Sequence, residues 1–215
     1  MGWIAWGVSN IRSGMFVQAL CRIPKAEGVL LTFDDGPDPE YTPRILDILS
    51  RHQAKACFFL IGSKALQNPQ IVRQILAEGH EIGNHSMRHG FLFSCLGPKK
   101  IAGEIQACCL TLEAISGKKI QFFRPPFGVT NPPLARALKG FPGMRVLGWT
   151  LRTRDTVARS PEVLIRRFQR SVEPGDVVLF HDRCSVTAEA LEGCLLFLKE
   201  KQIPAATPEI LKKYL

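Results

Sequence analysis

The chain has 215 residues, enough for one large domain or two small ones, and its 46% hydrophobic and 22% charged residues are typical of a globular protein. The excess of 28 Lys and Arg over 19 Asp and Glu gives a net charge of +9, which favours an anionic partner such as an anionic glycan or a lipid headgroup. Because the basic residues are dispersed and no nucleic-acid-binding motif is found, we expect no nucleic-acid partner.

The first 27 residues are predicted to be a segment separate from the main domain, residues 28–215. The stretch Gly2–Leu20 is apolar apart from Arg12 and a few polar residues. It lacks the basic start and cleavage pattern of a signal peptide and the uninterrupted length of a membrane span. We therefore expect a helix that packs on the domain, and the alternative is peripheral contact with a membrane surface.

The seven cysteines are odd in number, and none is paired as Cys-x-x-Cys. Several lie in apolar surroundings, where free thiols behave as small hydrophobic side chains. This usage indicates a reducing compartment, so we expect a protein that is cytoplasmic or peripheral to the membrane.

From residue 28 onward, short β-branched or aromatic runs alternate with amphipathic stretches, which is typical of a βα-repeating, largely parallel sheet. About seven strands are expected, too many for a small sandwich and close to the number in a (β/α) barrel. No linker or repeat interrupts them, so we predict an α/β barrel in a single domain. The predicted strands are Val29–Phe33, Lys55–Ile61, Glu81–Asn84, Gln121–Arg124, Arg145–Thr150, Asp176–His181 and Pro204–Ala206.

Three helices between these strands have recognisable starts, where a capping side chain or a proline stands at the first turn. Gly79 and Gly117 follow two of them, at positions where left-handed C-terminal caps are expected. The three starts are Asn68-Pro69, Pro98 and Ser160-Pro161.

Polar side chains follow several predicted strands at the point where each strand ends. In a parallel barrel the carboxyl ends of all strands open on one face, which is where active sites are found. Residues far apart in the sequence are therefore expected to converge there, namely Asp34, Asp35, His85, Arg124, Asp155 and His181.

The segment Thr32–Pro37 places Asp34 and Asp35 side by side at a strand end, directly before a turn. Taken alone, it is equally well explained as a polar turn in which an Asp caps a helix. Two adjacent carboxylates can instead divide the work, because one can bind a metal ion while the other stays free as a base.

His85 and His89 supply further ligands, since an i, i+4 pair on a helical turn presents both imidazoles on one face. An isolated pair with this spacing is more often two surface or capping histidines. Together with one carboxylate, however, two histidines leave open positions for water and substrate, which suits a catalytic Zn, Co or Fe(II) site.

His181 stands at the polar end of an apolar strand. A histidine there can be a hydrogen-bonded core residue, yet imidazole also suits a general acid that protonates a leaving amine. Asp155 would favour the protonated form of that imidazole. His52 and His80 are interpreted as structural.

Arg124 follows another strand, and Pro125 and Pro126 restrict the backbone after it, so that the loop can be rigid. A guanidinium close to Asp34 would keep that carboxylate ionised and oriented. The alternative is an ordinary salt-bridged loop.

Five segments follow one another along the chain as TFDDGP, HSMRH, FRPPFG, WTLRTRD and LFHD. In this order they resemble the five motifs of the polysaccharide deacetylases of carbohydrate esterase family four, over roughly residues 28–210. That family includes chitin, chitooligosaccharide and peptidoglycan deacetylases and some xylan acetylesterases. An ordered set of motifs is far more specific than any single one.

The resemblance implies a distorted (β/α) barrel in which Asp35, His85 and His89 bind one divalent metal ion, most often zinc. It also implies that Asp34 is the general base and His181 the general acid.

The remaining residues of the motifs take supporting roles in this family. The resemblance implies that Arg124 partners the base and Asp155 partners the acid. The backbone N–H of Phe127 would help to hold the oxyanion, with Pro125 beside it, and Leu179 would line the acetyl pocket.

One position departs from the family pattern. Many members follow the Asp of the fourth motif with a Trp that walls the acetyl pocket, whereas here Thr156 follows Asp155. This implies a smaller, more open pocket and leaves the acyl-group preference open. No carbohydrate-binding module is recognisable, so a short oligosaccharide or a glycolipid is as plausible a substrate as a polymer.

The expected reaction is hydrolysis of the N-acetyl group of an N-acetylhexosamine in an oligo- or polysaccharide or a glycolipid, with release of acetate. Three alternatives remain: an O-acetyl ester hydrolase acting on a glycan, an amidase of a small metabolite, and a non-enzymatic glycan- or polyanion-binding protein. Loss of a ligand or of the base would be expected in the last, whereas both aspartates and all three histidines are present.

Overall fold

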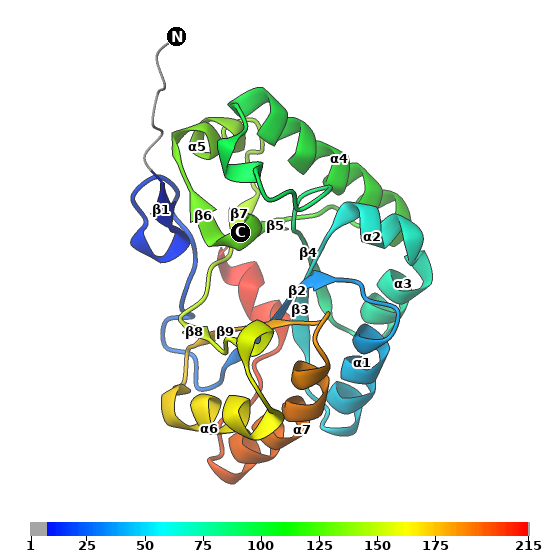
Figure 1. Cartoon of the computed structure of the whole chain (residues 1–215), viewed down its shortest axis with the longest axis vertical. Helices are drawn as coiled ribbons and strands as arrows, with labels where there is room; N and C mark the ends of the chain where they lie inside the picture. Colours follow the sequence, from blue (N-terminus) through cyan, green and yellow to red (C-terminus); the bar gives the residue numbers. More distant parts are fainter. Residues whose placement is uncertain (1–7, 215) are drawn as a thin grey trace.

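The computed structural model describes residues 8–214, which form an α/β domain around a curled sheet of seven parallel strands (Figure 1). The strands are β2 (Leu30–Gly36), β3 (Ala56–Leu60), β4 (Glu81–Asn84), β5 (Phe122–Phe123), β7 (Arg145–Val146), β8 (Leu151–Arg152) and β9 (Val177–His181). Their order is β7-β5-β4-β3-β2-β9-β8. The predicted distorted (β/α) barrel in a single domain is confirmed.

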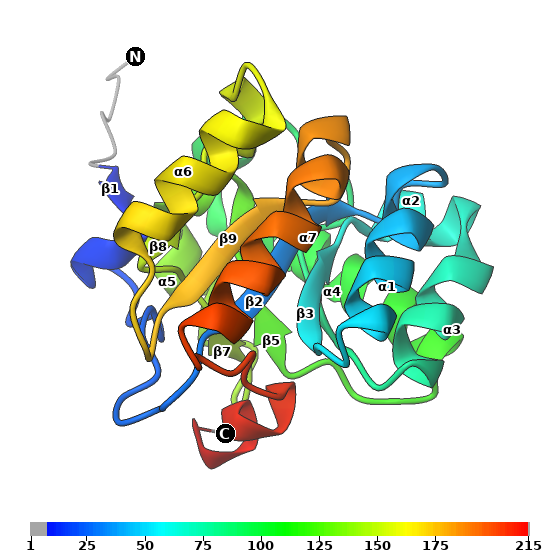
Figure 2. The same ribbon diagram turned by 90° about the horizontal axis from the view of Figure 1, so that it is seen from below.

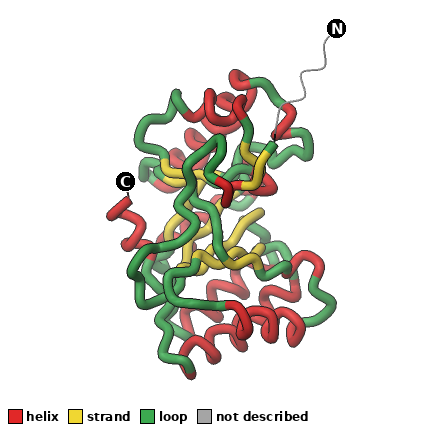
Figure 3. Tube along the Cα trace, turned by 90° about the vertical axis from the view of Figure 1, so that its left-hand side faces the viewer, coloured by secondary structure: helices red, strands yellow, loops and turns green. Residues whose placement is uncertain are grey.

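Helices cover the outside of this sheet. They are α1 (Tyr41–Arg51), α2 (Gly62–Gln67), α3 (Pro69–Ala77), α4 (Pro98–Ser116), α5 (Pro132–Leu138), α6 (Pro161–Ser171) and α7 (Ser185–Glu200), with 3-10 helices at Ile11–Ser13, Phe93–Cys95, Pro126–Gly128, Asp155–Val157 and Pro208–Tyr214. Helices α6, α7 and α1 lie side by side across one flank (Figure 2), and the strands lie inside the helical layer (Figure 3).

The centre of the sheet is a stack of aromatic rings. Phe33 on β2 lies between Phe58 on β3 and Phe180 on β9, with ring centroids 5.0 and 5.4 Å apart. All three side chains are fully buried, and each contributes roughly 1.5–3 kcal/mol to folding. Because both faces of these strands are covered, polar side chains come where the strands end.

Two predicted strands differ from the structure. The predicted strand Arg145–Thr150 is replaced by β7 and β8, of which β7 pairs with β5 and β8 with β9. One extended segment thus runs from one edge of the sheet to the other, which curls the sheet. The predicted strand Pro204–Ala206 is wrong, since Ala205 forms an isolated bridge with Val29 and Pro204 has no N–H to extend a ladder.

The three predicted helix starts are confirmed in position, because α3, α4 and α6 each begin at a proline. The expected side-chain caps are wrong. The Asn68 amide donates to the carbonyl of Lys64, and the Ser160 hydroxyl bonds to Glu162. Gly79 and Gly117 have φ of 78° and 67°, the left-handed conformation expected after a helix.

The N-terminal segment is not the predicted α-helix in its described part. Ser9–Asn10 (β1) pairs antiparallel with Val129–Thr130 (β6), and a single 3-10 turn follows. The Asn10 side chain accepts a hydrogen bond from the Arg12 N–H, and Gly14 is left-handed, so local bonds replace a helix.

The same segment nevertheless packs on the domain, because Ile11 and Val17 are buried. Residues 1–7, part of the predicted helix, lie outside the described residues. No helix within residues 8–214 is both long and apolar enough to cross a membrane.

Candidate active site

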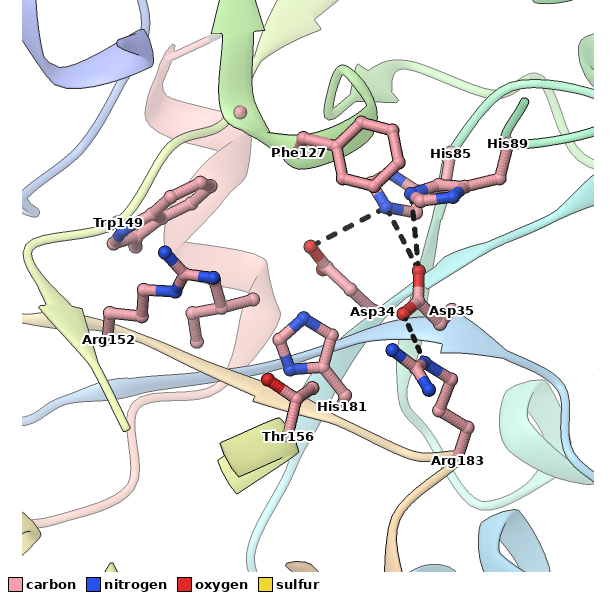
Figure 4. A pocket seen from close by; sticks show the side chains of 12 residues that line it. Asp34, Asp35, His85, His89, Phe127, Trp149, Arg152, Thr156, His181 and Arg183 are labelled. Carbon is pink, nitrogen blue, oxygen red and sulfur yellow. Dashed lines mark hydrogen bonds and ion pairs between the residues drawn. The ribbon is translucent and has the colours of Figure 1, made fainter. Parts of the chain in front are cut away.

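The carboxyl ends of the parallel strands enclose one cavity of about 360 Å³ (Figure 4). Asp34 and Asp35 come from β2, His85 follows β4, and His181 ends β9. The convergence expected from the strand ends is therefore observed. The lining residues are Asp34, Asp35, His85, His89, Phe127, Gly128, Trp149, Arg152, Thr156, Leu179, His181 and Arg183.

Asp35, His85 and His89 form a possible metal site, with one ligand atom of each within 4.8 Å of the others. The Asp35 Oδ1 lies 3.5 Å from His85 Nε2 and 3.4 Å from His89 Nε2. His85 Nδ1 donates to the carbonyl of Arg124 at 2.7 Å, so its Nε2 keeps a lone pair aimed into the cavity. A mixed nitrogen and carboxylate set of this kind fits a divalent metal ion.

The two histidines are not on a helical turn, which corrects the sequence-based expectation. Ser86 and His89 have φ of 67° and 49°, so the chain between the histidines is a left-handed loop. The Ser86 hydroxyl accepts a hydrogen bond from the His89 N–H and fixes this loop. The two imidazole rings still approach to 4.7 Å.

Protonation states in the triad suit metal binding. Burial raises the pKa of Asp35, but its contact with His85 and the other histidines that face it outweigh burial and hold the pKa well below its usual range. Burial and the neighbouring His85 lower the pKa of His89 to about 4. At neutral pH, Asp35 is therefore ionised and His89 neutral, which are the forms that bind metals.

Asp34 is held by a fully buried arginine. Arg124 Nη1 donates to Asp34 Oδ1 at 2.6 Å and to Thr32 Oγ1 at 2.8 Å. The rest of the guanidinium donates to the carbonyls of Leu147 and Gly148 at 2.9 and 2.7 Å. The second carboxylate oxygen of Asp34 lies 3.7 Å from His85 Nε2, so Asp34 is ordered but has one oxygen available on the cavity side.

His181 forms the opposite side of the cavity. Its Nδ1 lies 2.8 Å from Asp155 Oδ1, and Asp155 Oδ2 accepts hydrogen bonds from the His181 N–H and the Thr187 hydroxyl. Burial lowers the pKa of His181, but the bond and charge of Asp155 outweigh it, so the pKa is raised. The ring therefore readily carries a proton, and its Nε2 is not used in the bond to Asp155.

The other sequence-predicted site residues divide into two groups. Leu179 and Phe127 line the cavity, and Phe127, at φ 58°, packs its ring at a tilt against that of His89, with centroids 4.7 Å apart. Pro125 is not among the lining residues, and its carbonyl instead accepts from the Gly128 N–H, which fixes the loop. Thr156 does line the cavity, at the position noted as a departure from the family pattern.

The two histidines interpreted as structural lie outside the cavity. His80 is buried, and its Nδ1 accepts a hydrogen bond from the Ala56 N–H on β3. His52 bonds to Glu192 on α7.

Three cavity residues were missed by sequence reasoning. Arg183 donates from Nε to Asp35 Oδ2 at 2.6 Å, and Trp149 and Arg152 form one wall, where Figure 4 shows them side by side. Arg183 stands two residues after His181, and its place directly after a strand that ends in the cavity was an available signal.

Comparison with known proteins identifies relatives over most of the chain. The family model for polysaccharide deacetylases matches residues 22–144. A peptidoglycan-N-acetylglucosamine deacetylase of Bacillus cereus is 35% identical, over 90% of this chain and 92% of the relative. A chitooligosaccharide deacetylase of Sinorhizobium fredii is 32% identical, over 74% of each chain.

Solved structures agree with this relationship. The peptidoglycan deacetylase PdaC from Bacillus subtilis superposes with a TM-score of 0.80 at 30% identity, over 88% of this chain and 92% of that one. BA3943 of Bacillus anthracis, described as a pseudoenzyme of carbohydrate esterase family four, gives 0.77 at 34% identity, over 84% and 63%. The fold, the ordered motifs and these matches together show that the chain belongs to the polysaccharide deacetylase family.

Proposed function

We propose that this protein hydrolyses the N-acetyl group of an N-acetylhexosamine in a glycan or glycolipid, in a metal-dependent reaction that releases acetate. The proposal rests on one observation. A single cavity contains a possible metal site of Asp35, His85 and His89, a carboxylate oxygen of Asp34 that the protein leaves available, and the imidazole of His181. The names of the relatives, which act on peptidoglycan N-acetylglucosamine and on chitooligosaccharides, support the same bond and substrate class.

Asp35, His85 and His89 would hold the metal ion, for which zinc is the proposed identity because two imidazoles and one carboxylate suit it. Cobalt or another divalent ion is compatible with the same donors. When bound, the ion supplies Lewis acidity at the scissile carbonyl and lowers the pKa of water in the site.

The protein groups supply the proton transfers. Asp34, ionised and fixed by Arg124, accepts a proton from the water that adds to the carbonyl carbon of the acetamide. The C–N bond then breaks, and His181 gives its proton to the leaving amine, so acetate and a free amino sugar are formed. The backbone N–H of Phe127, a residue that lines the cavity in a left-handed turn, would help to hold the oxyanion.

The test is acetate release from N-acetylglucosamine oligomers by the purified chain, first stripped of metal and then reloaded with zinc or cobalt. We expect release that depends on reloading and that Asp35→Ala abolishes. Asp47→Ala serves as the matched control, because Asp47 is an exposed aspartate on α1. An absence of metal binding would overturn the proposal.

The same assay separates the alternatives. An O-acetyl ester needs less help from the acid, because an alkoxide leaves more readily than an amide nitrogen. Two results together would favour the esterase. The wild type would hydrolyse acetyl esters much faster than acetamides, and a His181→Ala variant would keep ester hydrolysis but lose amide hydrolysis. Tight glycan binding without hydrolysis of any acetyl substrate would favour a binding protein, a candidate raised by the likeness to BA3943.

A further inference from the structure

A second cavity, of about 570 Å³, adjoins the candidate active site. The two cavities share Trp149 and Arg152 as lining residues, so they border one another at this common wall. The far side of the second cavity is built by the N-terminal segment through Asn10, Arg12 and Arg22.

The two acidic residues of this second cavity are both paired with one arginine of the protein. Arg22 forms ion pairs with Asp176 at 3.0 Å and Glu173 at 3.2 Å, and it also donates to the carbonyl of Pro174. Asp176 is buried and accepts in addition from the Glu173 N–H. This group of charges therefore leaves little capacity for a ligand.

Three further arginines line the cavity without such partners. Arg12, Arg152 and Arg154 have no ion pair or side-chain hydrogen bond with any residue in the described part of the chain. Their exposed guanidiniums give the cavity a net positive charge, and each can donate to an oxyanion in forked geometry.

Local structure sets these arginines in place. Thr153 is buried and its hydroxyl donates to the Leu179 carbonyl, whereas Arg152 and Arg154 on either side of it are exposed. Arg12 is fixed from the other direction, because its N–H bonds to the Asn10 side chain and the adjacent Ile11 is buried.

We propose that this second cavity binds an anionic group, a carboxylate or a phosphate, carried by a sugar next to the one that is deacetylated. This inference rests on the proposed function, because that function places the sugar to be deacetylated in the first cavity and its neighbour beside the shared wall. It assigns the N-terminal segment a role in substrate selection, and it makes an anionic glycan the preferred substrate over a neutral oligomer of the same length.

The test compares the affinity of charged and neutral N-acetylglucosamine tetramers for the full chain carrying His181→Ala, which slows turnover. A reducing-end aldonate is compared with the alditol, which has the same open-chain end without the charge. A non-reducing-end uronate is compared with terminal glucose. A tetramer 1-phosphate forms a separate arm, so that carboxylate and phosphate are distinguished.

We expect at least one charged tetramer to bind about fivefold tighter than its neutral partner at low salt, since each exposed ion pair contributes only a few-fold. The added pair Arg12→Gln and Arg154→Gln should abolish this preference, and added salt should weaken it. Arg73→Gln, which removes an exposed charge on α3 far from the cavity, should leave it intact.

Equal binding of charged and neutral tetramers overturns the inference, and so does a lack of binding by all of them. A preference that falls equally in Arg73→Gln also overturns it, because the overall charge would then be the cause. Acetate release by wild type is scored separately. Release without charge preference removes only this inference, whereas charge preference without release removes only the proposed hydrolysis.

Discussion

The two neighbouring aspartates of the candidate active site each contact an arginine at 2.6 Å, in very different surroundings. Arg124, beside Asp34, is fully buried, whereas the side chain of Arg183, beside Asp35, is 47% exposed. Arg124 donates to four acceptors and lies over the ring of Phe59 at 4.2 Å. For Arg183 the bond to Asp35 is the one hydrogen bond found among the described residues.

Two ion pairs of equal length can therefore contribute very different free energies to folding. A buried charge that loses its partner cannot recover its hydration, whereas an exposed one can. Asp34 is therefore held by the interior of the protein, and Asp35 is held on one side by a side chain that solvent reaches.

The largest expected effect comes from breaking the buried pair. Arg124→Met should lower the free energy of unfolding by about 3–5 kcal/mol, because it leaves Asp34 charged and unpaired inside the protein. Urea denaturation monitored by circular dichroism measures it. If Arg124→Met lowered the free energy of unfolding by less than about 1 kcal/mol, the buried pair would be no stronger than the exposed one.

A third pair, His181 with Asp155, is also buried but contains a group that titrates. Asp155→Asn should lower kcat roughly a hundredfold, at the lower end of what a general acid contributes. Because Asp155 raises the pKa of His181, activity that needs the protonated ring is present at low pH and is lost as pH rises through that pKa. The substitution should move this loss to lower pH, as a pH profile of kcat would show. If the pH at which kcat is lost did not change in Asp155→Asn, His181 would not be the group whose titration controls activity.

The tight packing around the buried Arg124 should include the neighbouring loop at Gly128. Gly128 is at φ 64°, and a Cβ there would lie 2.1 Å from Trp149, whose ring is 5.6 Å from the Arg124 guanidinium. Gly128→Ala should therefore destabilise by roughly 1–3 kcal/mol. Gly103→Ala, on the exposed side of α4 where a Cβ meets nothing within 4 Å, is the matched control and should not destabilise.

The smallest expected effect comes from the exposed pair. Arg183→Met should change the free energy of unfolding by less than about 1 kcal/mol, the usual range for surface ion pairs. The same urea titration used for Arg124→Met gives the direct comparison. A loss as large as that of the buried pair would mean that Asp35 depends on Arg183 as strongly as Asp34 depends on Arg124.

Residues at strand ends were the most predictable part of this molecule. Asp34, Asp35 and His181 each follow an apolar run that is buried on both faces, and His85 follows the short strand Glu81–Asn84. A parallel sheet brings such strand ends to one edge, so their convergence follows from the order of the strands. The order of the motifs added the roles that the pattern could not supply.

Loop conformation and exposed charges could not be predicted in the same way. The turn between His85 and His89 depends on a left-handed Ser86 and a hydroxyl-to-amide bond, which no periodicity reveals. Arg152 and Arg183 look like ordinary solvated arginines in the sequence. The predicted N-terminal helix failed because Asn10 and its neighbours form a short strand pair with β6.

The position of β9 beside β2 has a consequence for the order in which the protein is made. β2 lies between β3 and β9, so the sheet cannot be completed until the last strand of the chain has been synthesised. Pairing between segments so distant along the chain is slow, because a long loop must close first. Asp35, His85 and His89 leave the ribosome long before His181 does. The proposed metal ligands are thus synthesised early, whereas the proposed proton donor joins the site only as folding ends.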